Sequence, residues 1–194
     1  REAKIVTGVK RDVNLVSRVD AGDGDLVTIM DVSHAKNRKD VKRLLEAGAI
    51  IEYFDHHDPN ELIDHPYITY HINTEPNVST GLIVNSHVGG KNRLWSIATA
   101  FGDNHIDLAM NMAKSENLSD EQVNLLKQIG LVVNYNSYGQ TVDDLFYSPE
   151  EIAEAVLYLV VPGFRPVAHK VGPIRASYPS STRASLCARA WALN

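Results

Sequence analysis

Three acidic residues and a pair of histidines are the side chains of this sequence best suited to chemistry. Asp55, His56 and His57 are consecutive and end one apolar run, Asp31 ends another, and Asp103 follows a helix-like stretch. Because α/β folds build their sites at the carboxyl ends of parallel strands, we expect the residues that end the two runs to lie close together. Carboxylate oxygens and imidazole nitrogens, with one position left for water, are the ligands of hydrolytic metal centres.

Asp31, His56 and Asp103 together supply a ligand set that is rich in carboxylates. Hard oxygen donors of this kind favour Mn²⁺, or Mg²⁺, over a zinc site built from thiolates. The chain has a single cysteine, Cys187, which excludes an internal disulfide and a cysteine-rich zinc site. We therefore expect Mn²⁺ or Mg²⁺ as the cofactor.

Alternating strand-like and helix-like segments surround these residues. Runs of β-branched and apolar residues predict strands at residues 4–8, 26–30, 50–54 and 68–72. Helical spacing of apolar residues predicts helices at residues 12–19 and 35–47. This alternation, with short connections, predicts an α/β fold with a mostly parallel sheet flanked by helices.

A helical segment is expected to follow the sheet. The predicted helices span residues 79–87, 94–101, 119–133 and 149–160. Two of them begin with a capping box, which runs from Ser119 to Gln122 in one case and from Ser148 to Glu151 in the other. We therefore expect one domain over residues 1–161, with helices at its C-terminal end.

Residues 162–194 differ in composition from the rest of the chain. The net charge of the whole sequence is −5, yet the stretch from Phe164 onward has five basic residues and no acid. Turn-forming residues without an apolar period predict irregular structure there. We interpret this tail as a non-native extension, and a basic arm that binds nucleic acid is the alternative.

Composition predicts a soluble, cytoplasmic protein. The 194 residues are 44% hydrophobic, which is enough for one sizeable core. No apolar run approaches the roughly 20 residues that a membrane-spanning helix needs, so no membrane partner is expected. The single cysteine fits a reducing compartment.

Three segments of the sequence resemble motifs of the DHH phosphoesterase family, in the family's order and spacing. The second family motif is similar to residues 28–31 (TIMD), the name-giving third to residues 53–57 (YFDHH), and the fourth to residues 98–104 (ATAFGDN). The resemblance covers about residues 4–103. The family includes RecJ-type exonucleases, oligoribonuclease-type enzymes, cyclic-dinucleotide phosphodiesterases and family II inorganic pyrophosphatases.

The resemblance implies a role for each of the five residues. Asp31, His56 and Asp103 would ligate the metal. His57 would face the substrate phosphate and protonate the leaving oxygen, and Asp55 would orient the ring of His56 by accepting its hydrogen bond. The implied reaction is hydrolysis of a phosphodiester or phosphoanhydride bond by a metal-activated water.

Asn104 and His105 directly follow the fourth motif and are candidates for substrate binding, together with His57. The expected substrate is a small phosphorylated or ester compound, or a short oligonucleotide. The remaining histidines are interpreted as hydrogen-bonded core residues or solvated surface residues. They are His34, His65, His71, His87 and His169.

The sequence departs from the family pattern at its beginning. The family opens with a strand that ends in an Asp-x-Asp motif, and nothing before residues 4–8 matches it. Residues 22–25 (GDGD) precede a strand instead of ending one, so they do not replace it. We therefore expect a truncated domain without its first strand, whose exposed sheet edges predict a homo-oligomer.

Two other functions stay open at this point. The same metal site could serve a permissive carboxylesterase, or the chain could be a non-catalytic fragment or self-associating scaffold. A serine hydrolase built on Ser79 is disfavoured because the sequence has no Gly-x-Ser-x-Gly motif, and helix N-capping is the preferred role of Ser79. Residues 134–139 are interpreted as a polar turn, with a pocket lining as the alternative.

Overall fold

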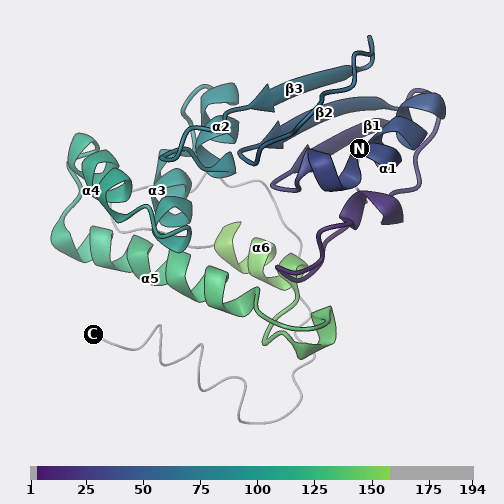
Figure 1. Ribbon diagram of the computed structural model, residues 1–194. Coiled ribbons are helices and arrows are strands. Elements are labelled where there is room, and N and C mark those ends of the chain that lie inside the picture. Colours follow the sequence, from purple (N-terminus) through teal and green to yellow (C-terminus); the bar gives the residue numbers. More distant parts are fainter. Residues whose placement is uncertain (1–3, 158–194) are drawn as a thin grey trace.

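The sheet carries the residues that the sequence singles out, and it consists of three parallel strands. In the computed structural model, which describes residues 4–157, the strands follow the order β1 (Leu26–Met30), β2 (Ile50–Asp55) and β3 (Ile68–Ile72). In Figure 1 the arrowheads of β2 and β3 point towards the side where α2 lies. The predicted α/β fold, with a parallel sheet followed by helices, is confirmed.

Helix α1 (His34–Glu46) packs on one face of the sheet, as the sequence predicts. Val41 and Leu44 are fully buried and pack against Ile29 of β1 and Ile51 of β2. The helix ends before Gly48, whose φ of 89° lies in the left-handed region that favours glycine. This packing fixes β1 and β2 side by side, with their carboxyl ends level.

The second half of the described chain is helical. The helices are α2 (Thr80–His87), α3 (Arg93–Gly102), α4 (Ile106–Ser115), α5 (Asp120–Asn136) and α6 (Pro149–Leu157). Phe101 of α3, Ala109 of α4 and Leu126 of α5 belong to a second hydrophobic core, separate from the one under the sheet. Figure 1 shows α5 running beneath α3 and α4, on the side away from the strands.

Both predicted capping boxes are present. The Ser119 hydroxyl accepts from the Gln122 amide at 3.3 Å, and the Gln122 side-chain oxygen accepts from the Ser119 amide at 2.8 Å. The corresponding distances for Ser148 and Glu151 are 3.2 and 2.8 Å. The helix predicted at residues 149–160 is described as far as residue 157.

The prediction of a strand at residues 4–8 is wrong. This segment is irregular, and the chain from Thr7 to Lys10 bonds to α6 and to the end of α5 instead of to the sheet. The Thr7 hydroxyl donates to Glu150 at 2.8 Å, and the Lys10 amide donates to the carbonyl of Ser137 at 3.0 Å. The side chain of Ile5 is 62% exposed, so no hydrophobic burial stabilises a strand at this position.

The prediction of a helix at residues 12–19 is only partly correct, because the structure has a single 3₁₀ turn there, η1 (Leu15–Arg18). The Asn37 side chain of α1 explains the difference. It donates to the carbonyl of Val13 at 2.6 Å and accepts from the amide of Val16 at 3.3 Å, so it satisfies backbone groups that a longer helix would pair internally.

The predicted domain boundary at residue 161 and the tail at residues 162–194 lie outside the described residues. Within residues 4–157, no helix combines the length and the hydrophobicity needed to cross a membrane. A further 3₁₀ turn, η2 (Val142–Asp144), connects α5 to α6.

The outer edge of β1 leads to the first testable prediction. Among the described residues β1 pairs with β2 alone, through bonds such as Ile50 N–H to Asp25 O and Asp31 N–H to Phe54 O. In a parallel ladder, alternate residues of a strand bond to the same neighbour. Asp25 and Asp31 bond to β2, so the N–H and C=O groups of Thr28 point to the other side, the open edge of the sheet. We expect the protein to self-associate through this edge, in a way that resists salt.

Thr28→Pro is expected to yield a smaller species because it removes an edge donor and leaves the bonds to β2 intact. Light scattering at low and high salt measures the effect. Ile29→Pro, whose amide points into the ladder, serves as the destabilising control. A wild-type chain that is monomeric at every salt concentration would contradict the prediction of self-association.

Candidate metal centre

Asp31 lies directly after β1 in an uncommon backbone conformation. Its φ is 59°, in the left-handed region that few residues other than glycine adopt, and such residues often occur at functional sites. Its Oδ1 accepts a hydrogen bond of 2.6 Å from the hydroxyl of Thr80, the first residue of α2. The start of α2 thus fixes the carboxylate that the sequence places first among the ligands.

His56 follows β2 and is oriented by a backbone carbonyl. Its Nδ1 lies 3.0 Å from the carbonyl oxygen of Val78, which can only accept, so Nδ1 carries the proton. In the neutral ring the lone pair therefore belongs to Nε2, and this nitrogen lies 3.6 Å from Asp31 Oδ1. A protonated Nδ1 with a free Nε2 is the tautomer that a metal ligand requires.

Asp55 holds the ring of His57, and not that of His56 as the family resemblance implies. Its fully buried carboxylate accepts from His57 Nδ1 at 2.7 Å and from the backbone amide of His56 at 2.8 Å, both on Oδ1. The ring of His56 bonds to Val78 because the chain turns after β2, which sends the two rings to different partners. The imidazole of His57, 48% exposed, thereby turns Nε2 away from Asp55.

The structure brings Asp31, His56 and His57 into one group. Each offers a ligand atom, and these atoms lie within 4.8 Å of one another. One carboxylate and two imidazoles are donors that Mn²⁺ accepts, and the buried Oδ2 of Asp55 next to them has no hydrogen-bond partner among the described residues. The donor set therefore fits a divalent ion such as Mn²⁺, and Mg²⁺ fits less well because it prefers oxygen ligands.

Asp103 lies outside that tight group but shares its electrostatic environment. Partial desolvation and the nearby Asp31 carboxylate raise the pKa of Asp103 above its usual range, while His56, His105 and Lys10 lower it. Two carboxylates that repel each other in this way form a site where a cation is favourable. The predicted ligand role of Asp103 stays a prediction.

Asn104 and His105 form the break between two helices. Asn104 has a φ of 62° just after α3, and its amide bonds to the carbonyl of Phe101. His105 precedes α4, and its carbonyl accepts the first helical bond from Ala109. Both residues thus have a role at a helix terminus, and their part in substrate binding stays a prediction.

Ser79 precedes α2 at the N-cap position, as the sequence predicts, yet its hydroxyl makes no capping bond. The residue is fully buried, and its hydroxyl has no partner among the described residues. A buried hydroxyl cannot attack a substrate, so this geometry agrees with the absence of a serine-hydrolase motif.

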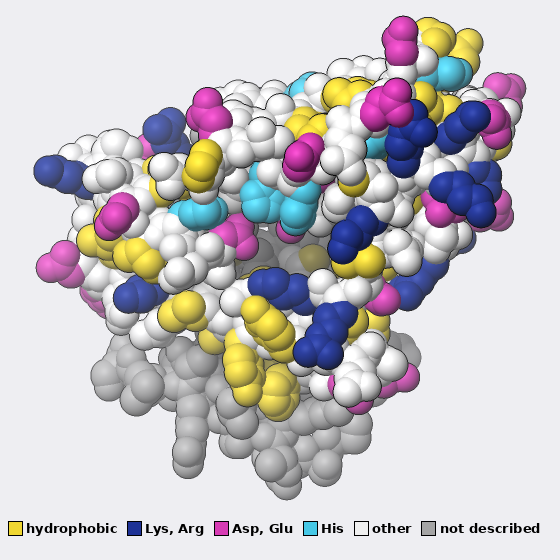
Figure 2. Space-filling view, viewed as in Figure 1, with side chains coloured by type: hydrophobic (Ala, Val, Ile, Leu, Met, Phe, Trp, Pro, Cys, Tyr) yellow, Lys and Arg dark blue, Asp and Glu magenta, His cyan; other side chains and the backbone are white. Residues whose placement is uncertain are grey.

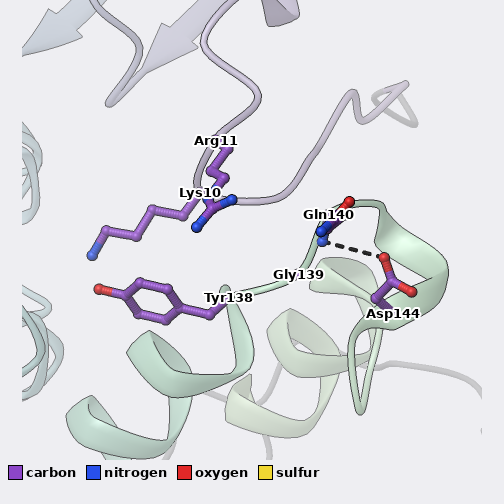
Figure 3. Close-up of a pocket in the computed structure, with 6 residues that line it drawn as sticks. All are labelled: Lys10, Arg11, Tyr138, Gly139, Gln140 and Asp144. Carbon is purple, nitrogen blue, oxygen red and sulfur yellow. Dashed lines mark hydrogen bonds between the residues drawn. The ribbon is translucent and has the colours of Figure 1, made fainter.

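An open pocket of about 480 Å³ lies between the N-terminal segment and the turn after α5. It is lined by Lys10, Arg11, Tyr138, Gly139, Gln140 and Asp144. Figure 3 shows the Lys10 side chain extended alongside the Tyr138 ring; its amine is 4.9 Å from the ring centre and donates to Asn134 Oδ1 at 2.8 Å. The prediction of a polar turn at residues 134–139 holds only in part, because residues 134–136 belong to α5; of this stretch, Tyr138 and Gly139 line the pocket.

Nothing in the sequence indicates that several residues of this region lie near the candidate metal centre. Thr80 and Val78 position Asp31 and His56, but they belong to a segment more than 20 residues away from either of the strand ends they contact. Lys10 lies close enough to affect the pKa of Asp103, although 93 positions separate them. Only tertiary packing joins these residues.

On one face of the molecule, histidine surfaces gather beside acidic ones above a hollow whose rim carries basic side chains (Figure 2). No protein-family model matches this chain, and neither the curated proteins nor the solved structures contain a significant match to it.

Proposed function

We propose that the chain is a metal-dependent hydrolase of the DHH phosphoesterase type, acting on phosphodiester or phosphoanhydride bonds. The observation that carries the proposal is the convergence of Asp31, His56 and His57 with both rings held at Nδ1. Atoms turned towards one point, each fixed by a partner behind it, are typical of metal centres, and an imidazole held beside the ligands in this way also suits a proton donor, the role assigned below to His57.

Each residue has a separate task in this proposal. Asp31 and His56 hold the metal, with Asp103 as the additional carboxylate. A divalent ion in this place would supply Lewis acidity that activates water and offsets the phosphate charge. His57, more exposed than His56 and held by Asp55, donates a proton from Nε2 to the leaving oxygen.

The basic residues near the site support an anionic substrate. Lys10 and Arg11 line one pocket, and the positive charge of Lys10 lowers the pKa of Asp103. A phosphate bound between the metal and these side chains would be attracted by positive charge from two sides. An uncharged carboxylic ester would gain nothing from Lys10 and Arg11.

A substrate panel tests the proposal. The full chain is stripped of metal, loaded with Mn²⁺ and supplied with a phosphodiester, a phosphomonoester and a carboxylic ester, each releasing nitrophenol. We expect Mn²⁺-dependent turnover that is fastest with a phosphorylated substrate. Faster ester hydrolysis that depends on Mn²⁺ would favour a carboxylesterase, and inactivity on all three would favour a non-catalytic scaffold.

His57→Ala provides the second prediction. We expect turnover of the phosphorylated substrate to fall by roughly 10²-fold, the scale of a lost proton donor, while bound Mn²⁺ is unchanged. His65→Ala, at a histidine whose ring bonds only locally to the Tyr67 amide, is the control. Loss of Mn²⁺ from the His57 variant would instead make His57 a ligand.

A further inference from the structure

A second convergent group lies on the sheet itself. Glu52 of β2, His71 of β3 and His87 at the end of α2 offer three ligand atoms within 4.8 Å of one another. The strand register explains part of the arrangement. Glu52 pairs with Thr69, two positions before His71, so Glu52 and His71 share the face of the sheet opposite α1.

The distances in this group suit a tetrahedral metal ion. Glu52 Oε1 lies 3.1 Å from His71 Nε2 and 3.5 Å from His87 Nε2. Two ligand atoms that are each about 2.0–2.1 Å from a tetrahedral ion lie about 3.4 Å apart. The observed separations lie on either side of that value, so an ion could be bound with only small movements of the side chains.

Phe54 fixes the two histidine rings. It stacks on His71 with ring centres 4.4 Å apart and planes 10° apart, and it meets His87 edge-on at 5.0 Å. Phe54 itself is buried, 3% exposed. Because Phe54 already restricts the two rings, less conformational entropy is lost when they are held in one orientation by a metal ion.

An open groove adjoins the group. Its volume is about 470 Å³, and both histidines line it together with apolar residues of α2 that include Leu82 and Ile83. Three protein ligands leave the fourth position of a tetrahedral ion vacant. That position would face the groove and be open to water or to a small ligand.

We propose that Glu52, His71 and His87 form a zinc site that is separate from the candidate metal centre. Two imidazoles and one carboxylate favour Zn²⁺, because later divalent metals bind nitrogen ligands more tightly, whereas the ligands proposed for the candidate metal centre, Asp31, His56 and Asp103, are richer in carboxylates and suit Mn²⁺. The bound ion cross-links β2, β3 and α2. Since the opposite end of α2 holds Thr80 against Asp31, zinc at this site also stiffens the support of the candidate metal centre.

Zinc titration of the full, metal-free chain tests this site. The Asp31→Asn/His56→Ala double variant removes the candidate metal centre, so the zinc that remains reports on the second site alone. We expect this variant to bind one equivalent of Zn²⁺ in competition with a chromophoric chelator, and its melting temperature to rise with zinc. A double variant that binds no zinc overturns the proposal.

His71→Phe, added to the double variant, removes the ligand nitrogen and keeps a ring to stack on Phe54. It should weaken zinc binding by about 10²-fold or more, since loss of a ligand costs at least as much as loss of its supporting partner. His65→Gln is the control and should leave zinc binding unchanged. Equal zinc affinity with and without His71→Phe would overturn the assignment.

Should circular dichroism show that the His71→Phe protein is unfolded, His87→Gln gives the same test at the exposed end of α2. The outcome is independent of the proposed hydrolase activity, because that activity is measured with Mn²⁺ on a chain with an intact candidate metal centre.

Discussion

Mn²⁺ binding and phosphodiester turnover are both expected to disappear when Asp31 is replaced by asparagine. Asp31 Oδ1 lies at the centre of the candidate site, 3.6 Å from His56 Nε2 and 2.6 Å from the Thr80 hydroxyl. Asparagine removes the charge and keeps the shape, and it tolerates the positive φ at this position about as well as aspartate does. The fold should therefore survive.

Thr80→Val is the matched comparison. It removes the hydrogen bond to Asp31 and leaves every proposed ligand in place, so we expect a loss of Mn²⁺ affinity of about 10- to 100-fold. Asp31→Asn should lower the Mn²⁺ affinity by more than Thr80→Val does. Equilibrium dialysis measures the affinity, and initial rates measure the turnover. If the two variants bind Mn²⁺ as tightly as the wild-type chain does, Asp31 is not a ligand and the site must be assigned elsewhere.

The strands that carry the site could be predicted because their sequences are strongly biased. Residues 26–30 and 50–54 are almost continuous apolar runs, and the structure places β1 and β2 there, with Ile51 and Tyr53 fully buried or nearly so. Parallel pairing then sets Asp31 beside the end of β2 without further information. The approach of Asp31 to His56 was foreseeable for the same reason.

The supports behind the ligands could not be predicted. The side chain of Thr80 and the carbonyl of Val78 reach the site only because α2 packs against the end of β2. The pairing of Asp55 with the His56 ring, which the family resemblance implies, is wrong for the same reason, because the turn after β2 directs Asp55 to His57. Hydrogen bonds of this kind depend on the path of the chain more than on residue type.

Helix α4 was not predicted, because its burial rests on small residues. Ala109 and Ala113 are its buried positions, and alanine gives a weak hydrophobic signal. The sequence just before the helix, Gly102 to Asn104, reads as a turn and not as a helix start. By contrast, the start of α5 was predicted correctly, because Ser119 and Gln122 supply a local capping signal.

Small residues also set the contact between α3 and α5, and this leads to the last prediction. Gly130, in the middle of α5, is buried against α3. A Cβ atom added to it would collide with the carbonyl oxygen of Ala98 and come within 2.8 Å of the Gly102 amide nitrogen. Both neighbours are backbone atoms, which cannot move aside without shifting α3.

Gly130→Ala is therefore expected to destabilise the protein by about 2 kcal/mol or more, within the range of overpacked cores. In an ordinary helix interior the same change stabilises by about 1 kcal/mol, so the sign of the effect is diagnostic. For a chain of this length, thermal unfolding should shift downward by roughly 4–8 °C. Asn124→Ala, at an exposed position of the same helix, should instead be neutral or slightly stabilising.

The consequence for function follows from the position of Asp103 at the end of α3. If alanine at position 130 moves α3 away from α5, Asp103 is displaced from Asp31. The Gly130→Ala chain should then bind Mn²⁺ more weakly than the Asn124→Ala chain, even at temperatures where both are folded. Equal Mn²⁺ affinity in the two variants, together with the lower melting temperature, would show that Asp103 contributes nothing to metal binding.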